Sequence, residues 1–314
     1  MGILYENAGL MGWAIWFAVL FGLMALNELA RSSKIFGIIL FMVVPVLLTI
    51  FVWPTTAAPG NEYGTGNWFN WVKAYSALAG CIGFMAICYV PGLNKSKFAL
   101  YFPPIILAVN ILEAVVRDFQ CFAYGAFEGA YINNLWVISG PWNIMNGIAG
   151  LLNIVTICGW LGIYVSKGKR RDMMWPDMIW PWIIAYDLWN FAYTYNCIAD
   201  HSFYCGLALL LSCTIPAFIV KRGMWLQHRA HTLAFWVMFV LTFPTFADRI
   251  APVFTTHNPV MFFIVSFLSL AFNLGLAIYQ FRKIRKEKLN PLKDEIYKNT
   301  KAYLDVVKEY EAME

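Results

Sequence analysis

Long apolar runs alternate with short polar segments along most of the chain. A helix of about 20 apolar residues crosses the roughly 30 Å hydrocarbon core of a bilayer. The predicted spans are 11–29, 35–53, 71–91, 98–116, 143–165, 177–196, 202–220, 231–249 and 259–281. The fourth, sixth and eighth spans are interrupted by polar residues. The pattern therefore predicts an all-α polytopic membrane protein with nine transmembrane helices.

The basic residues predict how these helices are oriented. Lys and Arg accumulate in the loops that stay in the cytoplasm. All of the 23 Lys and Arg residues except Lys73, Arg117 and Arg249 fall after the odd-numbered spans, which lie on one side of the membrane if the helices alternate. This asymmetry predicts an external N-terminus and a cytoplasmic C-terminus. We expect the protein to reside in the plasma membrane of a bacterium.

Composition excludes the soluble classes of protein. The chain of 314 residues is 60% hydrophobic and only 13% charged, whereas soluble domains carry about 25% charged residues. So little polar surface cannot cover a globule of this size. A soluble enzyme, a secreted disulfide scaffold, a disordered chain and a nucleic-acid-binding protein are therefore excluded.

The C-terminal segment 282–314 is predicted to form a cytoplasmic tail that follows the transmembrane domain 1–281. Its first residues are rich in Lys and Arg, and each such charge is attracted to anionic lipid headgroups by about 1 kcal/mol. Apolar residues then recur at roughly helical spacing, at Ile296, Tyr303, Val307 and Tyr310. We expect a short amphipathic helix that lies in solvent or along the membrane surface, with docking of a protein partner as the alternative.

The fourth and sixth spans resemble each other. Each has a proline, and six residues later an amide or acid: Asn110 with Glu113 in one, Asp187 with Asn190 in the other. This spacing predicts that spans three and four repeat as spans five and six in the same orientation, a plan found in many transporters. Chance similarity between apolar helices is the alternative.

Polar side chains gather at the depth of the bilayer centre. They are Asn110, Glu113, Asp187, Asn190, Asn153 and Asn273. An ionised carboxylate at this depth costs at least a few kcal/mol, and we expect no Lys or Arg there to neutralise Glu113 or Asp187. Such a cluster is typical of a bound cation or a transferable proton. Interhelical hydrogen bonding is the structural alternative.

Aromatic residues surround Asp187. Tyr186 and Tyr193 share its helical face, and Trp189 lies on the neighbouring flank. Aromatic faces beside an acid suit a large organic cation. Packing against lipid explains the same residues equally well.

Charged residues also mark the predicted outer helix ends. Arg117, Asp118, Asp248 and Arg249, together with Lys73 and Asp200, are expected to form a gate or an outer ring of ion pairs. The segment 117–142 is long enough to lie over the bundle as a lid, or passively along the interface.

Several cofactor chemistries lack their residues. No histidine is expected at mid-membrane, as a haem between facing helices requires, and the ninth span has no lysine for a retinal Schiff base. No phosphate-binding loop, nucleophile elbow or zinc motif occurs, so no cofactor or metal is predicted. Of the seven cysteines, Cys121, Cys197 and Cys205 lie on the outer side; one disulfide is conceivable there, but buried free thiols are favoured.

These observations favour a secondary transporter of a cation, a proton-coupled solute or a small organic amine. Glu113 and Asp187 are predicted to bind the cation or proton, and the four amides to coordinate it. One alternative is a membrane-embedded enzyme that acts on a lipid or isoprenoid with Asp118, Asp200 or Asp248. Another is a receptor or sensor that signals through its tail.

Overall fold

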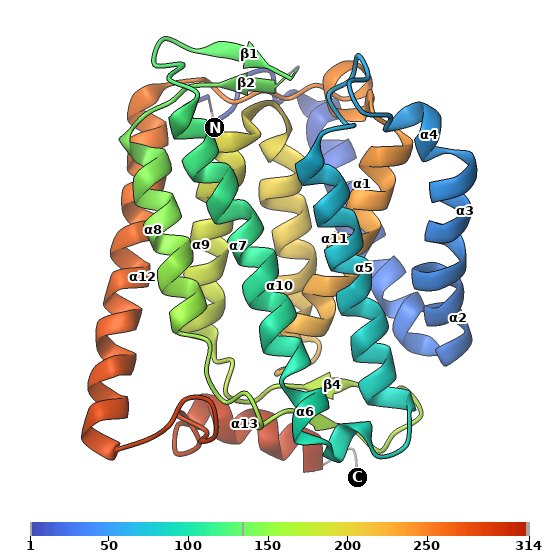
Figure 1. Ribbon diagram of the computed structural model, residues 1–314, viewed down its shortest axis with the longest axis vertical. Helices are drawn as coiled ribbons and strands as arrows, with labels where there is room; N and C mark the ends of the chain where they lie inside the picture. The colour runs from blue at the N-terminus through green and yellow to red at the C-terminus, as the bar shows by residue number, and fades with distance from the viewer. Residues whose placement is uncertain (1, 134, 312–314) are drawn as a thin grey trace.

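Helices that run side by side dominate the computed structural model, which describes residues 2–133 and 135–311 (Figure 1). The first part of the chain contains α1 (Leu10–Ser32), α2 (Lys34–Ile38), the π-helix η1 (Ile39–Val43), α3 (Val44–Phe51), α4 (Trp53–Thr56), α5 (Trp68–Tyr89), the 3-10 turn η2 (Leu93–Lys95), α6 (Lys97–Leu100) and α7 (Phe102–Ala123). Strands β1 (Ala130–Ile132) and β2 (Leu135–Val137) follow.

The second part of the chain completes the bundle. It contains α8 (Pro141–Val155), strands β3 (Tyr164–Val165) and β4 (Met173–Met174), α9 (Trp180–Cys197), η3 (Ala199–His201), η4 (Phe203–Ala208), α10 (Leu209–Ile219), α11 (Trp225–Thr242), η5 (Phe246–Ile250), α12 (Pro259–Glu287) and α13 (Lys301–Glu311). We call the end with β1 and β2 the hairpin end, and the end with β3, β4 and α13 the tail end (Figure 1).

Five helical segments of the described residues are long and apolar enough to cross a membrane. They are Leu10–Ser32, Lys34–Phe51, Trp68–Tyr89, Lys97–Ala123 and Pro259–Glu287. Each falls on one of the predicted spans. The prediction of a helical integral membrane protein is thus confirmed in outline.

The other four predicted spans fall on shorter or more polar helices. Among them, α11 is buried without interruption from Trp225 to Met238. Such an interior helix packs against protein on all sides, so it can hold Gln227 and Arg229 where a lipid-facing helix could not. That these helices also cross the membrane stays a prediction.

The predicted span 143–165 is wrong in its second half. Helix α8 ends at Val155, and the chain turns at Gly159, whose φ of 64° favours glycine. The backbone N–H of Gly159 then donates to the carbonyl of Pro291 in the tail, 3.1 Å away. Residues 156–165 look like membrane helix because they are apolar, but they are buried against the tail instead.

The tail packs against the tail end of the bundle. Asp177 accepts hydrogen bonds from the backbone N–H groups of Ile296, at 2.9 Å, and Tyr297, at 2.7 Å. Ile296, Tyr297 and Tyr303 are buried. The expected solvated or membrane-surface helix therefore has its apolar face covered by the protein. The side chain of Tyr310 and residues 312–314 lie outside the described part.

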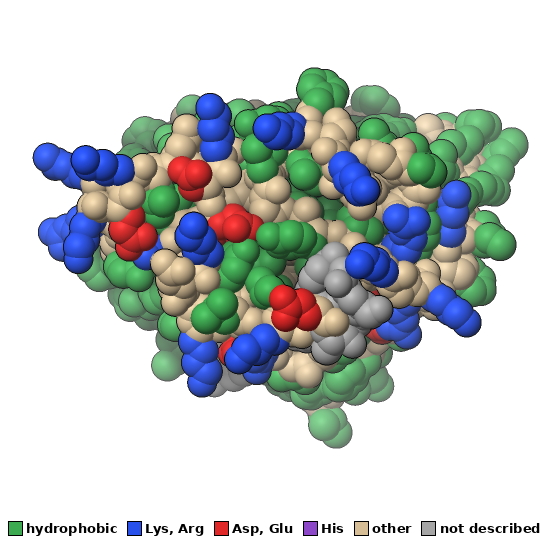
Figure 2. Space-filling view, turned by 90° about the horizontal axis from the view of Figure 1, so that it is seen from below, with side chains coloured by type: hydrophobic (Ala, Val, Ile, Leu, Met, Phe, Trp, Pro, Cys, Tyr) green, Lys and Arg blue, Asp and Glu red, His purple; other side chains and the backbone are tan. Residues whose placement is uncertain are grey.

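Lys and Arg side chains are spread over the tail end (Figure 2). Beneath them Asp172 is fully buried, with Oδ1 3.1 Å from Nε of Arg31 and Oδ2 2.7 Å from Nζ of Lys221. Burial by itself raises the pKa of the Asp172 carboxyl. The hydrogen bonds and positive charges of Arg31 and Lys221 outweigh burial, and that pKa lies below its ordinary value.

The segment predicted as a lid or interfacial loop contains a β-ribbon. Helix α7 continues to Ala123, and β1 then pairs with β2 in antiparallel register, with Tyr131 opposite Trp136. The N-terminal residues reach the same end, where Tyr5 bridges to Thr255. This bridge joins the segment before α1 to the segment before α12 at the hairpin end.

Candidate functional site

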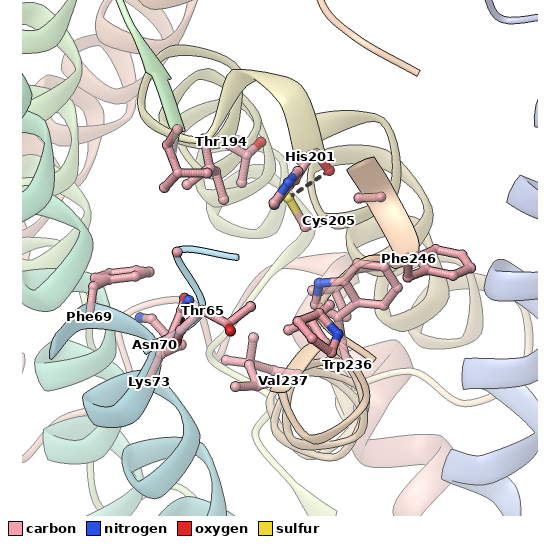
Figure 3. A pocket seen from close by; sticks show the side chains of 18 of the residues that line it. Thr65, Phe69, Asn70, Lys73, Thr194, His201, Cys205, Trp236, Val237 and Phe246 are labelled. Atoms are coloured by element: carbon pink, nitrogen blue, oxygen red, sulfur yellow. Dashed lines mark hydrogen bonds between the residues drawn. The ribbon is translucent and has the colours of Figure 1, made fainter. Parts of the chain in front are cut away.

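A cavity of about 100 Å³ lies between α5, α9 and α11 near the hairpin end (Figure 3). Tyr63, Thr65 and Leu135 line it where it approaches the loops of that end. Its buried polar lining residues include Thr65, Lys73, Asn190, Tyr193, Thr194 and Arg229. The cavity thus connects a face of the protein to charged groups inside the bundle.

Lys73 is paired with Glu113 beside this cavity. Its Nζ lies 2.8 Å from Oε2 of Glu113 and donates to the backbone carbonyl of Asn110, at 2.8 Å, and to Oδ1 of Asn110, at 3.0 Å. Ser76 adds a hydrogen bond of 3.2 Å to the same carboxylate oxygen. Oε1 of Glu113 is buried without a hydrogen-bond partner.

The prediction that no basic residue neutralises the acids is therefore wrong for Glu113. Lys73 belongs to the second turn of α5, and its backbone position alone suggested the outer ring of ion pairs. Its flexible four-carbon stem instead carries the ammonium group into the bundle. Position along a helix does not reveal where such a long side chain ends.

Arg229 is the second buried cation at the cavity. The sequence placed it in a cytoplasmic loop, but α11 begins at Trp225 and includes Arg229. Only 5% of the residue is exposed. Its Nε donates to the hydroxyl of Tyr186 at 3.1 Å, and its Cζ lies 5.7 Å from the centre of that ring. Its Nη1 is buried and has no hydrogen-bond acceptor.

Asp187 does not line the cavity, although it precedes Asn190 and Thr194 by three and seven residues on the same face of α9. Its Oδ2 accepts a hydrogen bond of 2.8 Å from Thr214 on α10, and Thr214 also accepts one from Trp225. Oδ1 of Asp187 is buried and unpartnered. Of the predicted residues on α9, Asn190 and Tyr193 line the cavity.

A second, smaller cavity of about 30 Å³ adjoins the first. Asn110 and Tyr186 line it, and Arg229 and Leu233 line both cavities. Arg229 therefore stands between the two spaces.

The amides Asn153 and Asn273 form a separate contact. Asn153 donates to the side chain of Asn273, which donates in turn to the backbone carbonyl of Ala185 at 3.0 Å. These bonds join α8, α12 and α9. Their geometry is that of interhelical hydrogen bonding in a membrane bundle.

The predicted aromatic cluster around α9 is packed into the core. Trp189 is fully buried and stacks on Tyr193 with ring centres 6.3 Å apart. The aromatic residues that line the cavity include Phe69, Trp236 and Phe246, which the sequence did not single out (Figure 3). They lie on α5, α11 and η5, and only the three-dimensional packing brings them together.

The expected ion pairs at Arg117 and Asp118 have other partners. Asp118 is fully buried and accepts hydrogen bonds from Asn146, at 2.9 Å, and from the Cys197 thiol. Arg117 donates to Gln120 and Tyr124 on its own side of α7. Successive residues of a helix point in directions about 100° apart, so the two side chains do not face each other.

Histidines take the place of arginines at the hairpin end. Nε2 of His201 lies 2.6 Å from Asp248, and Nε2 of His257 lies 2.7 Å from Asp200. The Arg249 guanidinium instead lies over the ring of Tyr63, 5.6 Å from its centre. His201 also lines the cavity, so one His–Asp pair borders the site.

The cysteines are all free and buried. Cys121 and Cys197 lie near Asp118, and Cys205 lines the cavity opposite α5 (Figure 3). Their thiols pack and donate hydrogen bonds within the bundle.

Residues 6–309 match a family model described as "Family of unknown function (DUF5692)". The chain belongs to this family. No curated protein and no solved structure matches it significantly. The family model covers nearly the whole chain, so it includes both the helical bundle and the tail that packs against it. Its description names no activity, and the function has to be argued from the cavity.

Proposed function

We propose that this protein is a secondary transporter that admits a small solute from the hairpin end. In this proposal nine helices cross the plasma membrane of a bacterium, with the hairpin end outside and the tail end in the cytoplasm. The observation that carries the proposal is the cavity that extends from the hairpin end to Lys73, Asn190 and Arg229. Polar groups buried around an open space within a membrane bundle are a functional feature by default.

The size of the cavity suits a small solute. A space of about 10 to 15 Å³ takes one water molecule. The cavity, at about 100 Å³, therefore has room for roughly seven to ten non-hydrogen atoms. Asn190 and the Tyr193 hydroxyl supply hydrogen-bonding groups from α9.

Two acids provide a route to proton coupling. Glu113 neutralises Lys73, so a proton on Glu113 would release the ammonium group at the cavity wall. Solute binding and proton binding would then favour each other through one linkage free energy. Asp187 on α9, with one buried and unpartnered oxygen, is the second proton-binding group. Asn153 and Asn273 join α8 and α12 to α9, the helix that carries Asn190 and Tyr193.

Flux into proteoliposomes tests the proposal. Purified protein is reconstituted with an internal pH-sensitive dye and supplied with benzenesulfonate, benzenesulfonamide or phenyltrimethylammonium, three probes of equal size and different charge. We expect proton movement coupled to at least one probe. Asp187→Asn should reduce that flux at least about tenfold, equivalent to 1.4 kcal/mol, while membrane insertion is unchanged.

The matched control is Asp305→Asn. Asp305 pairs with Arg222 at the tail end, 3.1 Å away and far from the cavity, and this variant should transport normally. Absence of flux for all three probes would overturn the proposal. Normal flux in Asp187→Asn would remove Asp187 from the coupling mechanism.

A further inference from the structure

Arg229 carries a buried charge that no described residue pairs with directly, and the acid whose field favours that charge, Asp187, lies beyond ion-pair distance. An arginine side chain stays protonated in proteins, and a buried charge is unfavourable unless an anion or well-placed polar groups compensate for it. No carboxylate of the described residues comes within 4.0 Å of the Arg229 guanidinium. Lys73 differs, because Glu113 lies 2.8 Å from its ammonium group.

The guanidinium also keeps hydrogen-bonding capacity for a ligand. Tyr186 accepts from Nε, whereas Nη1 is buried and unpartnered although Arg229 lines the cavity. The planar fork of a guanidinium binds a carboxylate or a related oxyanion through two parallel hydrogen bonds. An oxyanion in the cavity would supply the hydrogen-bond acceptor that Nη1 of Arg229 lacks.

The walls of the cavity fit an apolar body attached to that anion. Phe69, Trp236 and Phe246 line the space (Figure 3), and Leu233 and Val237 line it as well. No Asp or Glu of the described residues lines it. Cations would meet Lys73 and Arg229 without a facing acid, and are disfavoured.

We propose that the solute is a small organic anion, with its carboxylate or sulfonate group held by Arg229 and its apolar body against the aromatic wall. Lys73 adds a second positive charge when Glu113 is protonated, and Asn190 adds an amide. This proposal rests on the proposed function and specifies its substrate class. It reverses the charge that the sequence suggested, because the buried charged residues that line the cavity are Lys73 and Arg229, and no described acid lines it.

Binding measurements on the full-length protein in lipid nanodiscs test this inference without any need for flux. Calorimetry with benzenesulfonate, benzenesulfonamide and phenyltrimethylammonium compares an anion, a neutral analogue and a cation. We expect benzenesulfonate to bind at least about tenfold more tightly than benzenesulfonamide, and phenyltrimethylammonium to show no binding. This selectivity is measured on the unaltered protein, so it does not depend on whether a variant folds.

Substitutions then locate the anion site. Arg229→Gln should weaken benzenesulfonate binding at least about tenfold, and Arg229→Lys should weaken it less, because the charge remains while the fork is lost. Arg222→Gln, which removes an arginine at the tail end, is the matched control and should bind as the unaltered chain does. Each variant is first checked for a cooperative thermal transition.

The outcomes separate this inference from the transporter proposal. Binding of benzenesulfonate without flux would overturn transport and leave the anion site standing. Equal or tighter binding of phenyltrimethylammonium would overturn the anion site, as would no binding of benzenesulfonate at millimolar concentration. Unchanged benzenesulfonate binding in a folded Arg229→Gln protein would also overturn it.

Discussion

Lys73 on α5 and Glu113 on α7 form an ion pair of 2.8 Å inside the helical bundle. Both side chains are at least nine-tenths buried, and both belong to a network with Asn110 and Ser76. The pair joins α5 to α7. The sequence alone indicated only that these two helices follow one another along the chain. It also holds a positive charge at the wall of the cavity.

Breaking this pair should destabilise the protein more than removing it. Glu113→Gln or Lys73→Met leaves one buried charge alone, and such changes cost about 3–5 kcal/mol. The double variant removes both charges and should lose less than the sum of the two single losses. Chemical unfolding in detergent, followed by tryptophan fluorescence, measures the three free energies of unfolding. Additive losses would show that the two groups do not interact.

Asp172 should make stability depend on acid pH. Its pKa in the folded protein lies below the ordinary 3.8, because the nearby charges of Arg31 and Lys221 outweigh the effect of burial. A depressed pKa contributes stability that is present above the unfolded-state value and lost as pH falls through the folded-state value. We therefore expect this contribution to be complete at pH 5 to 7 and to fall below about pH 4.

Asp172→Asn is the variant that isolates this effect. It should lose up to about 3–5 kcal/mol at neutral pH, because it removes the buried carboxylate that pairs with Arg31 and Lys221 and leaves Arg31 only the more exposed Glu28. The difference in unfolding free energy from the unaltered chain should shrink as the pH is lowered through 4. Asp305→Asn is the control, since its pair with Arg222 is a surface pair worth about 1 kcal/mol or less. A difference that is constant from pH 7 to pH 3 would contradict the assignment.

The apolar pattern identified the helices that border the bundle but could not identify where a buried segment stops being helix. Periodicity and hydropathy predicted 11–29 and 259–281 because those segments are apolar along their whole length. Residues 156–165 are equally apolar, and they fold as turns and a strand because the tail covers them. Burial against protein and burial in lipid have the same signature in one sequence.

The candidate site was predicted in part. Asn190 and Tyr193 line the cavity, and Glu113 and Asn110 contact Lys73 at its wall. Lys73 and Arg229 were missed as members of the site, because their backbones lie near predicted helix ends and their charges fit a loop. One signal in the sequence could have placed Arg229 in a helix. It follows Trp225 and lies between His228 and His231 in a segment without Gly or Pro that continues into an apolar run, which is unlike a solvated loop.

The contact of Asp177 with the tail should control access to the C-terminal segment. Asp177→Ala removes both acceptors of the Ile296 and Tyr297 N–H groups, and a buried donor left unpaired costs about 1–3 kcal/mol. We expect the segment after Lys288 to be cleaved faster in limited proteolysis. Glu287→Ala, which removes only a partner of Lys283 on the exposed face of α12, should be cleaved at the rate of the unaltered chain. Equal cleavage of both variants would mean that the tail is held by its apolar contacts alone.

Gly150 should be intolerant of even one added carbon. It lies on α8 where that helix meets α7 and α9, and a Cβ there would clash with Val115 and lie 2.6 Å from Nε1 of Trp189. Trp189 is fully buried and stacks on Tyr193 of the cavity, so neither neighbour can withdraw easily. We expect Gly150→Ala to destabilise the protein by about 1–3 kcal/mol, as overpacked cores do.

Gly22→Ala on α1 provides the comparison for that change. A Cβ at Gly22 meets no atom within 4 Å, so this variant should keep only the helix-propensity gain of up to about 1 kcal/mol. Thermal unfolding of both variants in the same detergent gives the two shifts, which should have opposite signs. If Gly150→Ala unfolds at a temperature equal to or above that of Gly22→Ala, the close approach of α8 to Trp189 is not a constraint on the fold. Overpacking at Gly150 should also weaken benzenesulfonate binding, because Trp189 supports the Tyr193 ring at the cavity wall.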